Sequence, residues 1–110
     1  MSDGPAPLQP GPGDACAPVV GPAAARSVMI VNRKGLHARA AARFVKLAQT
    51  FNAEIAVTNR DTAVSGLSIM GLMMLAAGQG CLLQLRARGP AAAEALAALA
   101  ALIERKFDED

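Results

Sequence analysis

Apolar positions change their period several times along the chain, and each change predicts a new element. Residues 26–32 contain the short apolar and β-branched run SVMIVN, which is typical of a strand. From residue 38 to about residue 50, apolar side chains recur at helical spacing, which predicts an amphipathic helix. Residues 54–59 and 62–65 indicate the two strands of a hairpin, with a tight turn at residues 60–61.

Three more elements follow the hairpin. Residues 68–77 predict a short helix closed by glycines, and residues 81–88 alternate between apolar and polar side chains, as in a strand with one face in water. Gly89 and Pro90 then open an alanine-rich helix that runs to about residue 106. Its expected buried stripe consists of Leu96, Leu99, Leu102 and Ile103. The order β-α-β-β-α-β-α fits a two-layer α+β fold, an open-faced β-sandwich with helices on one face of a four-stranded, mostly antiparallel sheet.

The first part of the chain differs in composition from the rest. Six of the seven prolines and four of the ten glycines lie within residues 1–22, a segment that buries too little apolar surface to offset chain entropy. We therefore predict a flexible tail over residues 1–25, one domain over residues 26–107 and an acidic C-terminus over residues 108–110. The N-terminus has no secretory signal pattern, and no run approaches the ~18 apolar residues of a membrane span, so we expect a soluble, cytoplasmic protein.

Composition and charge narrow the function classes. The 110-residue chain has one histidine, two cysteines, no tryptophan and no tyrosine. With Cys16 and Cys81 far apart, we expect two free thiols and no metal ion or other cofactor. With only three phenylalanines as aromatic side chains, the composition disfavours nucleic-acid binding by base stacking. The net charge of +2 is unevenly distributed along the chain. Residues 26–88 contain nine basic side chains and only two acidic ones, Glu54 and Asp61. A local basic surface is expected.

The lone histidine, His37, lies where a loop meets the start of the first predicted helix. The first N–H groups of a helix have no acceptors within it, and the helix dipole adds roughly half a positive charge there. This field favours a neutral, nucleophilic imidazole and offers hydrogen bonds to any dianion attached to it. Arg39 can add a charge-assisted hydrogen bond. The alternative is that His37 only caps the helix.

The remaining sequence offers this histidine no catalytic partners. Neither a Ser/His/carboxylate set nor a pair of carboxylates is apparent, which disfavours hydrolysis, and we predict that the protein is not an enzyme. A lone, exposed histidine can still accept a group from one protein and pass it to another.

The second helix supplies a candidate docking surface. Ser68 begins this helix, where serine is favoured as an N-cap and a phosphate would also be tolerated. The helix is apolar nearly all round, so we expect about half of its five large apolar side chains in the core and the rest in an adaptable docking patch. These five are Ile69, Met70, Leu72, Met73 and Met74. On the first helix, Arg39, Arg43 and Lys46 form a basic stripe, which is either a solvated face or the rim of a surface that docks acidic protein faces.

Two motifs resemble those of a known family. The segment GLHARAA, residues 35–41, resembles the active-site motif of HPr, the histidine phosphocarrier of the bacterial phosphoenolpyruvate-dependent phosphotransferase system (PTS). SIMGLM, residues 68–73, resembles the regulatory-serine motif of those HPr proteins that are substrates of HPr kinase/phosphorylase. The closing residues 89–110 are similar to the C-terminal helix of the nitrogen-branch paralogue. The resemblance covers about residues 27–107 and indicates a regulatory-branch HPr.

The resemblance implies a role for each matching residue. His37 would take a phosphoryl group on Nδ1 from phosphorylated enzyme I and donate it to an EIIA-type domain, and Arg39 would interact with that group. Ser68 would be the site of ATP-dependent regulatory phosphorylation. The shared docking surface would include Ile69, Met70 and Met73. The implied sheet has strand order 1-4-2-3 with three helices on one side, and the protein would be a monomer without membrane insertion.

One residue departs from the family pattern, and two other functions stay open. Ala40 stands where the family usually has proline, so we expect a slightly looser helix start with function retained. A non-catalytic binding module would use the methionine-rich helix, with His37 and Ser68 as plain caps. A small RNA-binding domain would use the basic stripe and show salt-dependent affinity.

Overall fold

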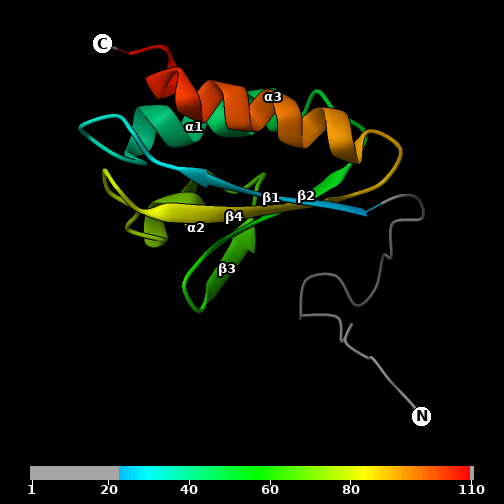
Figure 1. Ribbon diagram of the computed structural model, residues 1–110, viewed down its shortest axis with the longest axis horizontal. Helices are drawn as coiled ribbons and strands as arrows, with labels where there is room; N and C mark the ends of the chain where they lie inside the picture. Colours follow the sequence, from blue (N-terminus) through cyan, green and yellow to red (C-terminus); the bar gives the residue numbers. More distant parts are fainter. Residues whose placement is uncertain (1–22, 110) are drawn as a thin grey trace.

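The computed structural model describes residues 23–109, which form one sheet and its covering helices (Figure 1). The elements are β1 (Ala23–Met29), α1 (Ala38–Ala48), β2 (Glu54–Asn59), β3 (Thr62–Ser65), α2 (Ile69–Met74), β4 (Leu82–Arg88), α3 (Ala92–Glu104) and a 3₁₀ turn, η2 (Lys106–Asp108). None of these helices is long and apolar enough to cross a membrane.

The sheet has the predicted strand order, β1-β4-β2-β3, and every pairing is antiparallel. All seven residues of β1 pair with β4, from Ala23 opposite Arg88 to Met29 opposite Leu82. The alternating pattern of β4 buries Leu83, among others, on the helix side and leaves its other face exposed. The α+β open-faced sandwich is therefore confirmed: α1 and α3 cover one face of the sheet (Figure 1), and α2 contributes Leu72 to the same core.

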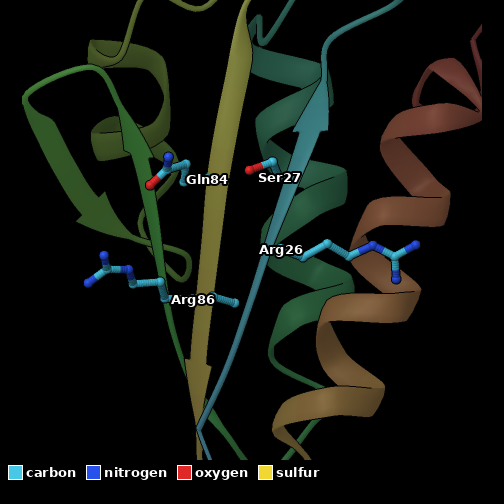
Figure 2. Close-up of a pocket in the computed structure, with 5 residues that line it drawn as sticks. Arg26, Ser27, Gln84 and Arg86 are labelled. Carbon is cyan, nitrogen blue, oxygen red and sulfur yellow. The ribbon is translucent and has the colours of Figure 1, made fainter.

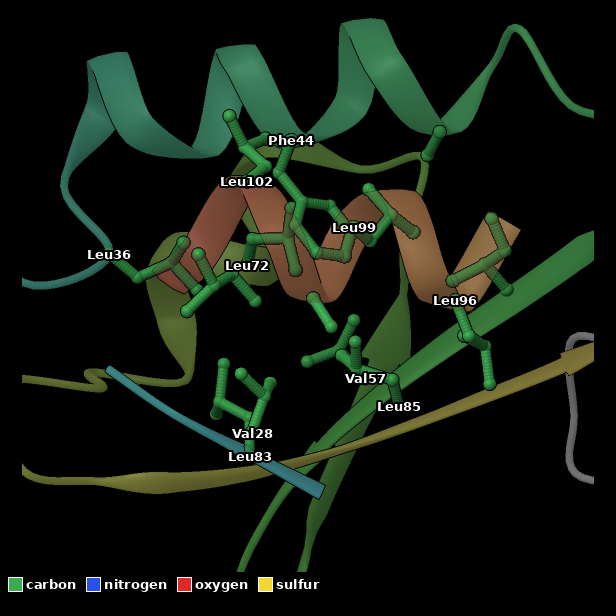
Figure 3. Packing of buried hydrophobic residues seen from close by; sticks show 14 of the residues in the cluster. Val28, Leu36, Phe44, Val57, Leu72, Leu83, Leu85, Leu96, Leu99 and Leu102 are labelled. Carbon is green, nitrogen blue, oxygen red and sulfur yellow. The ribbon is translucent and has the colours of Figure 1, made fainter. Parts of the chain in front are cut away.

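The core lies between the helices and the sheet and is almost entirely aliphatic. Phe44 of α1 packs near Leu72 of α2 and Leu99 of α3 above the strands (Figure 3). Alanines on the inner faces of α1 and α3 are fully buried and let these helices approach their neighbours closely. The stripe predicted for α3 is confirmed by the burial of Leu96, Leu99, Leu102 and Ile103. Phe107, beyond α3, is also fully buried.

Several predicted boundaries are corrected. The strand predicted at 26–32 begins at Ala23, inside the predicted tail, because the first residues of β1 pair with the end of β4. The rest of that tail and Cys16 lie outside the described residues. The second helix ends at Met74 and not near residue 77, since Ala76 has a positive φ of 53°. The hairpin strands β2 and β3 have the predicted bounds.

Candidate functional site

A tightly held loop delivers His37 to the start of α1. Gly35 has a φ of +67°, and a Cβ on it would lie 2.5 Å from the carbonyl oxygen of Ala77. The next residue, Leu36, donates its N–H to that same oxygen at 2.9 Å. The backbone carbonyl of Asn32 accepts the N–H of Gly35 at 3.2 Å, which closes the turn. The loop is therefore pinned against the segment before β4, and this contact sets where α1 begins.

His37 is the N-cap residue of α1, as predicted, but its imidazole does not cap the helix. Its backbone is extended, its carbonyl accepts the N–H of Ala41 at 2.8 Å, and its side chain makes no capping hydrogen bond. The side chain is 26% exposed. The alternative prediction that the imidazole of His37 only caps the helix is therefore wrong, and the imidazole is available for other contacts.

The imidazole instead contacts Glu109. Nε2 of His37 lies 2.8 Å from Oε2 and 3.1 Å from Oε1 of this residue. Oε1 also accepts a hydrogen bond from Nδ2 of Asn32 at 3.2 Å. Burial acts to raise the pKa of Glu109, but hydrogen bonds from His37 and Asn32, with the nearby charges of His37 and Lys34, outweigh it and place the pKa below its usual value. Glu109 is therefore a carboxylate near neutral pH.

Glu109 belongs to a folded segment, residues 105–109, which we call the C-terminal strap. The buried Phe107 anchors the strap, and the guanidinium of Arg43 on α1 donates a hydrogen bond to the Phe107 carbonyl. Arg105 donates from Nε to Oδ1 of Asp108 at 2.9 Å and holds the pKa of that carboxyl below its usual value. Figure 1 shows the end of α3 beside the start of α1. The acidic residues 108 and 109 are thus part of the domain, which corrects the predicted boundary after residue 107.

The three side chains of the predicted basic stripe differ in exposure and in hydrogen bonding. Arg39 and Lys46 are exposed, and within residues 23–109 neither makes a hydrogen bond or an ion pair. Arg39 is therefore near His37 in sequence, but within the described residues no hydrogen bond joins the two side chains. Arg43 is half-buried and its guanidinium donates a hydrogen bond to the Phe107 carbonyl, so it has a structural contact, and its part in partner binding stays a prediction. Ala40, in place of the usual proline, is fully buried.

Ser68 and the apolar helix form a separate exposed surface. Oγ of Ser68 accepts the N–H of Gly71 at 2.9 Å, so the predicted cap of α2 is confirmed. Of the five large apolar side chains on α2 only Leu72 is buried, which corrects the expectation that half would be. The reason is that α2 has only six residues and turns one narrow face toward the core. The exposed four are Ile69, Met70, Met73 and Met74.

Other parts of the described structure do not extend the site. The pocket in Figure 2 lies across β1 and β4, where Arg26, Ser27, Gln84 and Arg86 line it. None of these residues is a predicted site residue. Over residues 23–109, no three metal-ligating side chains gather, and Cys81 is a half-buried free thiol.

Sequence reasoning missed Asn32, Phe107 and Glu109. The sequence offered one signal, for Phe107 itself. It is a single aromatic side chain among charged closing residues, a pattern that could have predicted that the end of the chain packs into the core. Nothing local marked Glu109 as a partner of His37, because the two residues are 72 positions apart.

Comparison with known proteins places these features in a family. Residues 24–105 match the family model described as the PTS HPr component phosphorylation site. The chain is 48% identical to the phosphocarrier protein HPr of Neisseria meningitidis over 84 residues, 76% of this chain and 94% of that protein. It is 44% identical to the phosphocarrier protein NPr of Shewanella violacea, over 76% of this chain and 92% of that protein.

A solved structure agrees with the sequence match. The crystal structure of an HPr from Thermoanaerobacter tengcongensis superposes with a TM-score of 0.76 at 42% identity, covering 79% of this chain and 98% of that chain. The family model, the relatives and the solved structure agree with one another, and the chain belongs to the HPr family of PTS phosphocarrier proteins.

Proposed function

We propose that the chain takes a phosphoryl group on His37 from phosphorylated enzyme I and passes it to an EIIA-type domain. The observation that carries this proposal is the imidazole of His37, which is partly exposed at the N-terminus of α1 and is not used as a cap. A dianion attached there would lie near the N–H groups of the first helical turn, which favour negative charge.

Arg39 has the role of stabilising that phosphoryl group. It is exposed and has no partner within the described part of the chain, so its guanidinium is available to turn toward a phosphate two residues away. Phosphoryl transfer depends mainly on positioning and on charge stabilisation, and these two residues supply both.

The exposed face of α2 is proposed as the docking surface for these partners. Ile69, Met70 and Met73 are between 42% and 72% exposed, an unusual density of apolar side chains for a six-residue helix. Lys46 on α1, which packs against α2, adds an exposed positive charge. An acidic partner surface with an apolar centre would complement this arrangement.

Ser68 is proposed as a regulatory site for HPr kinase/phosphorylase, with ATP as donor. Its Oγ faces the first N–H groups of α2, so phosphate oxygens could keep the hydrogen bond with Gly71. The added charge would lie at the edge of the docking surface and should oppose binding of a partner that prefers a basic and apolar face.

Incubation with enzyme I and phosphoenolpyruvate tests the carrier function. The full chain should acquire one acid-labile, alkali-stable phosphate, and His37→Ala should acquire none. The chain has a single histidine, so the assignment needs no mapping. Labelling that survives His37→Ala would contradict the proposal, and a wild-type chain without phosphohistidine would favour a binding module that uses α2. Acceptance by carbon-type or nitrogen-type EIIA domains then identifies the branch.

A further inference from the structure

The contact between His37 and Glu109 constrains where the ring proton lies. A carboxylate can only accept hydrogen bonds, and both of its oxygens face Nε2 at 2.8 and 3.1 Å. Nε2 must therefore carry the hydrogen. In the neutral imidazole the lone pair is then on Nδ1, to which no hydrogen bond is made within residues 23–109.

The C-terminal strap places Glu109 beside His37 through a strained backbone conformation. Lys106, Phe107 and Asp108 have φ values of 60°, 57° and 60°, a left-handed run that non-glycine residues rarely adopt. Such a run persists only where its surroundings hold it. Here the holding contacts are the burial of Phe107 and the hydrogen bond from Arg43 to its carbonyl. The carboxylate of Glu109 is thus placed by structure built around it.

Asn32 also binds the carboxylate of Glu109. This residue is 1% exposed, and its Nδ2 donates to the carbonyl of Gly35 at 2.9 Å and to Oε1 of Glu109 at 3.2 Å. Both partners are acceptors, so the amide orientation is determined, and Oδ1 is left buried with no partner in the described structure. Leaving a buried acceptor unpaired is unfavourable, yet it is tolerated at a place where the amide fixes Glu109.

We propose that Glu109 is a positioning residue for phosphoryl transfer, which keeps the hydrogen on Nε2 of His37 and directs the Nδ1 lone pair to the incoming phosphorus. The proposal rests on the carrier function proposed above. In the transfer, the Nδ1 lone pair forms the N–P bond while the bond from phosphorus to the phosphorylated donor breaks, and its electron pair leaves with the donor. The ring keeps its Nε2 hydrogen and gains a positive charge beside the carboxylate of Glu109.

The return step follows the same path backward. When the phosphoryl group passes to the nucleophile of an acceptor protein, the N–P electron pair returns to Nδ1 and the ring becomes neutral again. No proton has to enter or leave His37 in either direction, because Glu109 holds Nε2–H throughout. Glu109 acts at Nε2, whereas Arg39 and the helix N-terminus are proposed to act on the phosphate itself, so the two kinds of stabilisation do not compete.

The test compares the full-length wild-type chain with Glu109→Ala, Glu109→Gln and the matched control Asp108→Asn. The control neutralises the adjacent acid, which binds Arg105 and does not contact His37. The first readout is the proton NMR signal of Nε2–H in the unphosphorylated protein. We expect a hydrogen-bonded signal, protected from exchange with water, in the wild type, Asp108→Asn and Glu109→Gln, whose amide oxygen can still accept. It should be lost in Glu109→Ala.

The second readout is transfer from phosphorylated enzyme I. We expect kcat to fall about ten-fold in Glu109→Ala, and less in Glu109→Gln, with KM unchanged because the docking surface is intact. Asp108→Asn should transfer like the wild type. A Glu109→Ala chain with the wild-type Nε2–H signal, or with an unchanged or raised kcat, would overturn the proposal. If the wild type is not phosphorylated at all, the carrier function fails, while the Nε2–H signal still tests the positioning contact.

Discussion

Replacing Gly35 with alanine tests how the loop before His37 is held. An alanine at φ +67° costs roughly 1–2 kcal/mol relative to glycine, because its Cβ approaches the following carbonyl. Its Cβ would also lie 2.5 Å from the oxygen of Ala77 and 2.8 Å from Cα of Gly78, so backbone must move. Losing the hydrogen bond from Leu36 to Ala77 adds about 1 kcal/mol, for a total of about 2–3 kcal/mol.

Two other glycines provide matched controls. Gly80 also has a positive φ, of 91°, but an added Cβ meets nothing within 4 Å, so Gly80→Ala should cost only about 1–2 kcal/mol. Gly78 has neither constraint, and Gly78→Ala should be neutral or stabilise by about 0.5 kcal/mol. The unfolded-state entropy of a Gly→Ala change is common to all three, so differences within the series report the folded structure.

The assay is urea unfolding followed by far-ultraviolet circular dichroism, because the chain has no tryptophan or tyrosine for fluorescence. The slope of stability against urea should be the same in all variants, which shows that the folded and unfolded states expose similar surface. If Gly35→Ala costs no more than Gly80→Ala, the close approach to Ala77 does not hold the loop and the reasoning is refuted. Gly35→Ala should also slow phosphorylation of His37, which Gly78→Ala should not.

Three further predictions concern the site. Ser68→Ala should cost about 1 kcal/mol by urea unfolding, because it removes the cap of α2, and Ser68→Asp should slow transfer from enzyme I through its charge. Arg39→Ala should lower transfer to His37 without changing the urea midpoint, since Arg39 is exposed and makes no hydrogen bond or ion pair within the described structure. The folded pKa of Glu109 lies below its ordinary value of 4.5, so its contribution to stability is present above that pH and is lost as the pH falls through the folded value. Urea midpoints from about pH 3 to 6 should show this loss in the wild type and not in Glu109→Gln.

The local elements could be predicted because local residues determine them. The β2–β3 hairpin has alternating strands and a two-residue turn, and its bounds agree with the prediction. The start of α1 directly after His37 follows from the loop and the helical spacing that comes after it. In both cases the decisive interactions are within a few residues of one another.

The parts that could not be predicted depend on residues far apart in the chain. β1 begins at Ala23 because β4 offers it a partner, and three alanines carry no strand pattern of their own. The strap turns through left-handed conformations that its sequence does not favour, and only the core pocket for Phe107 makes that turn stable. The same fold joins the guanidinium of Arg43 to the Phe107 carbonyl and brings Glu109 to His37.

The central claim is that His37 carries the phosphoryl group on the nitrogen that Glu109 leaves open. The most direct measurement is ³¹P and ¹⁵N NMR of the ¹⁵N-labelled full chain, phosphorylated by enzyme I and phosphoenolpyruvate. We predict a single phosphoramidate whose phosphorus is coupled to Nδ1, with Nε2 still protonated. Phosphorus coupled to Nε2, or a phosphate on any other residue with both ring nitrogens unmodified, would contradict the account.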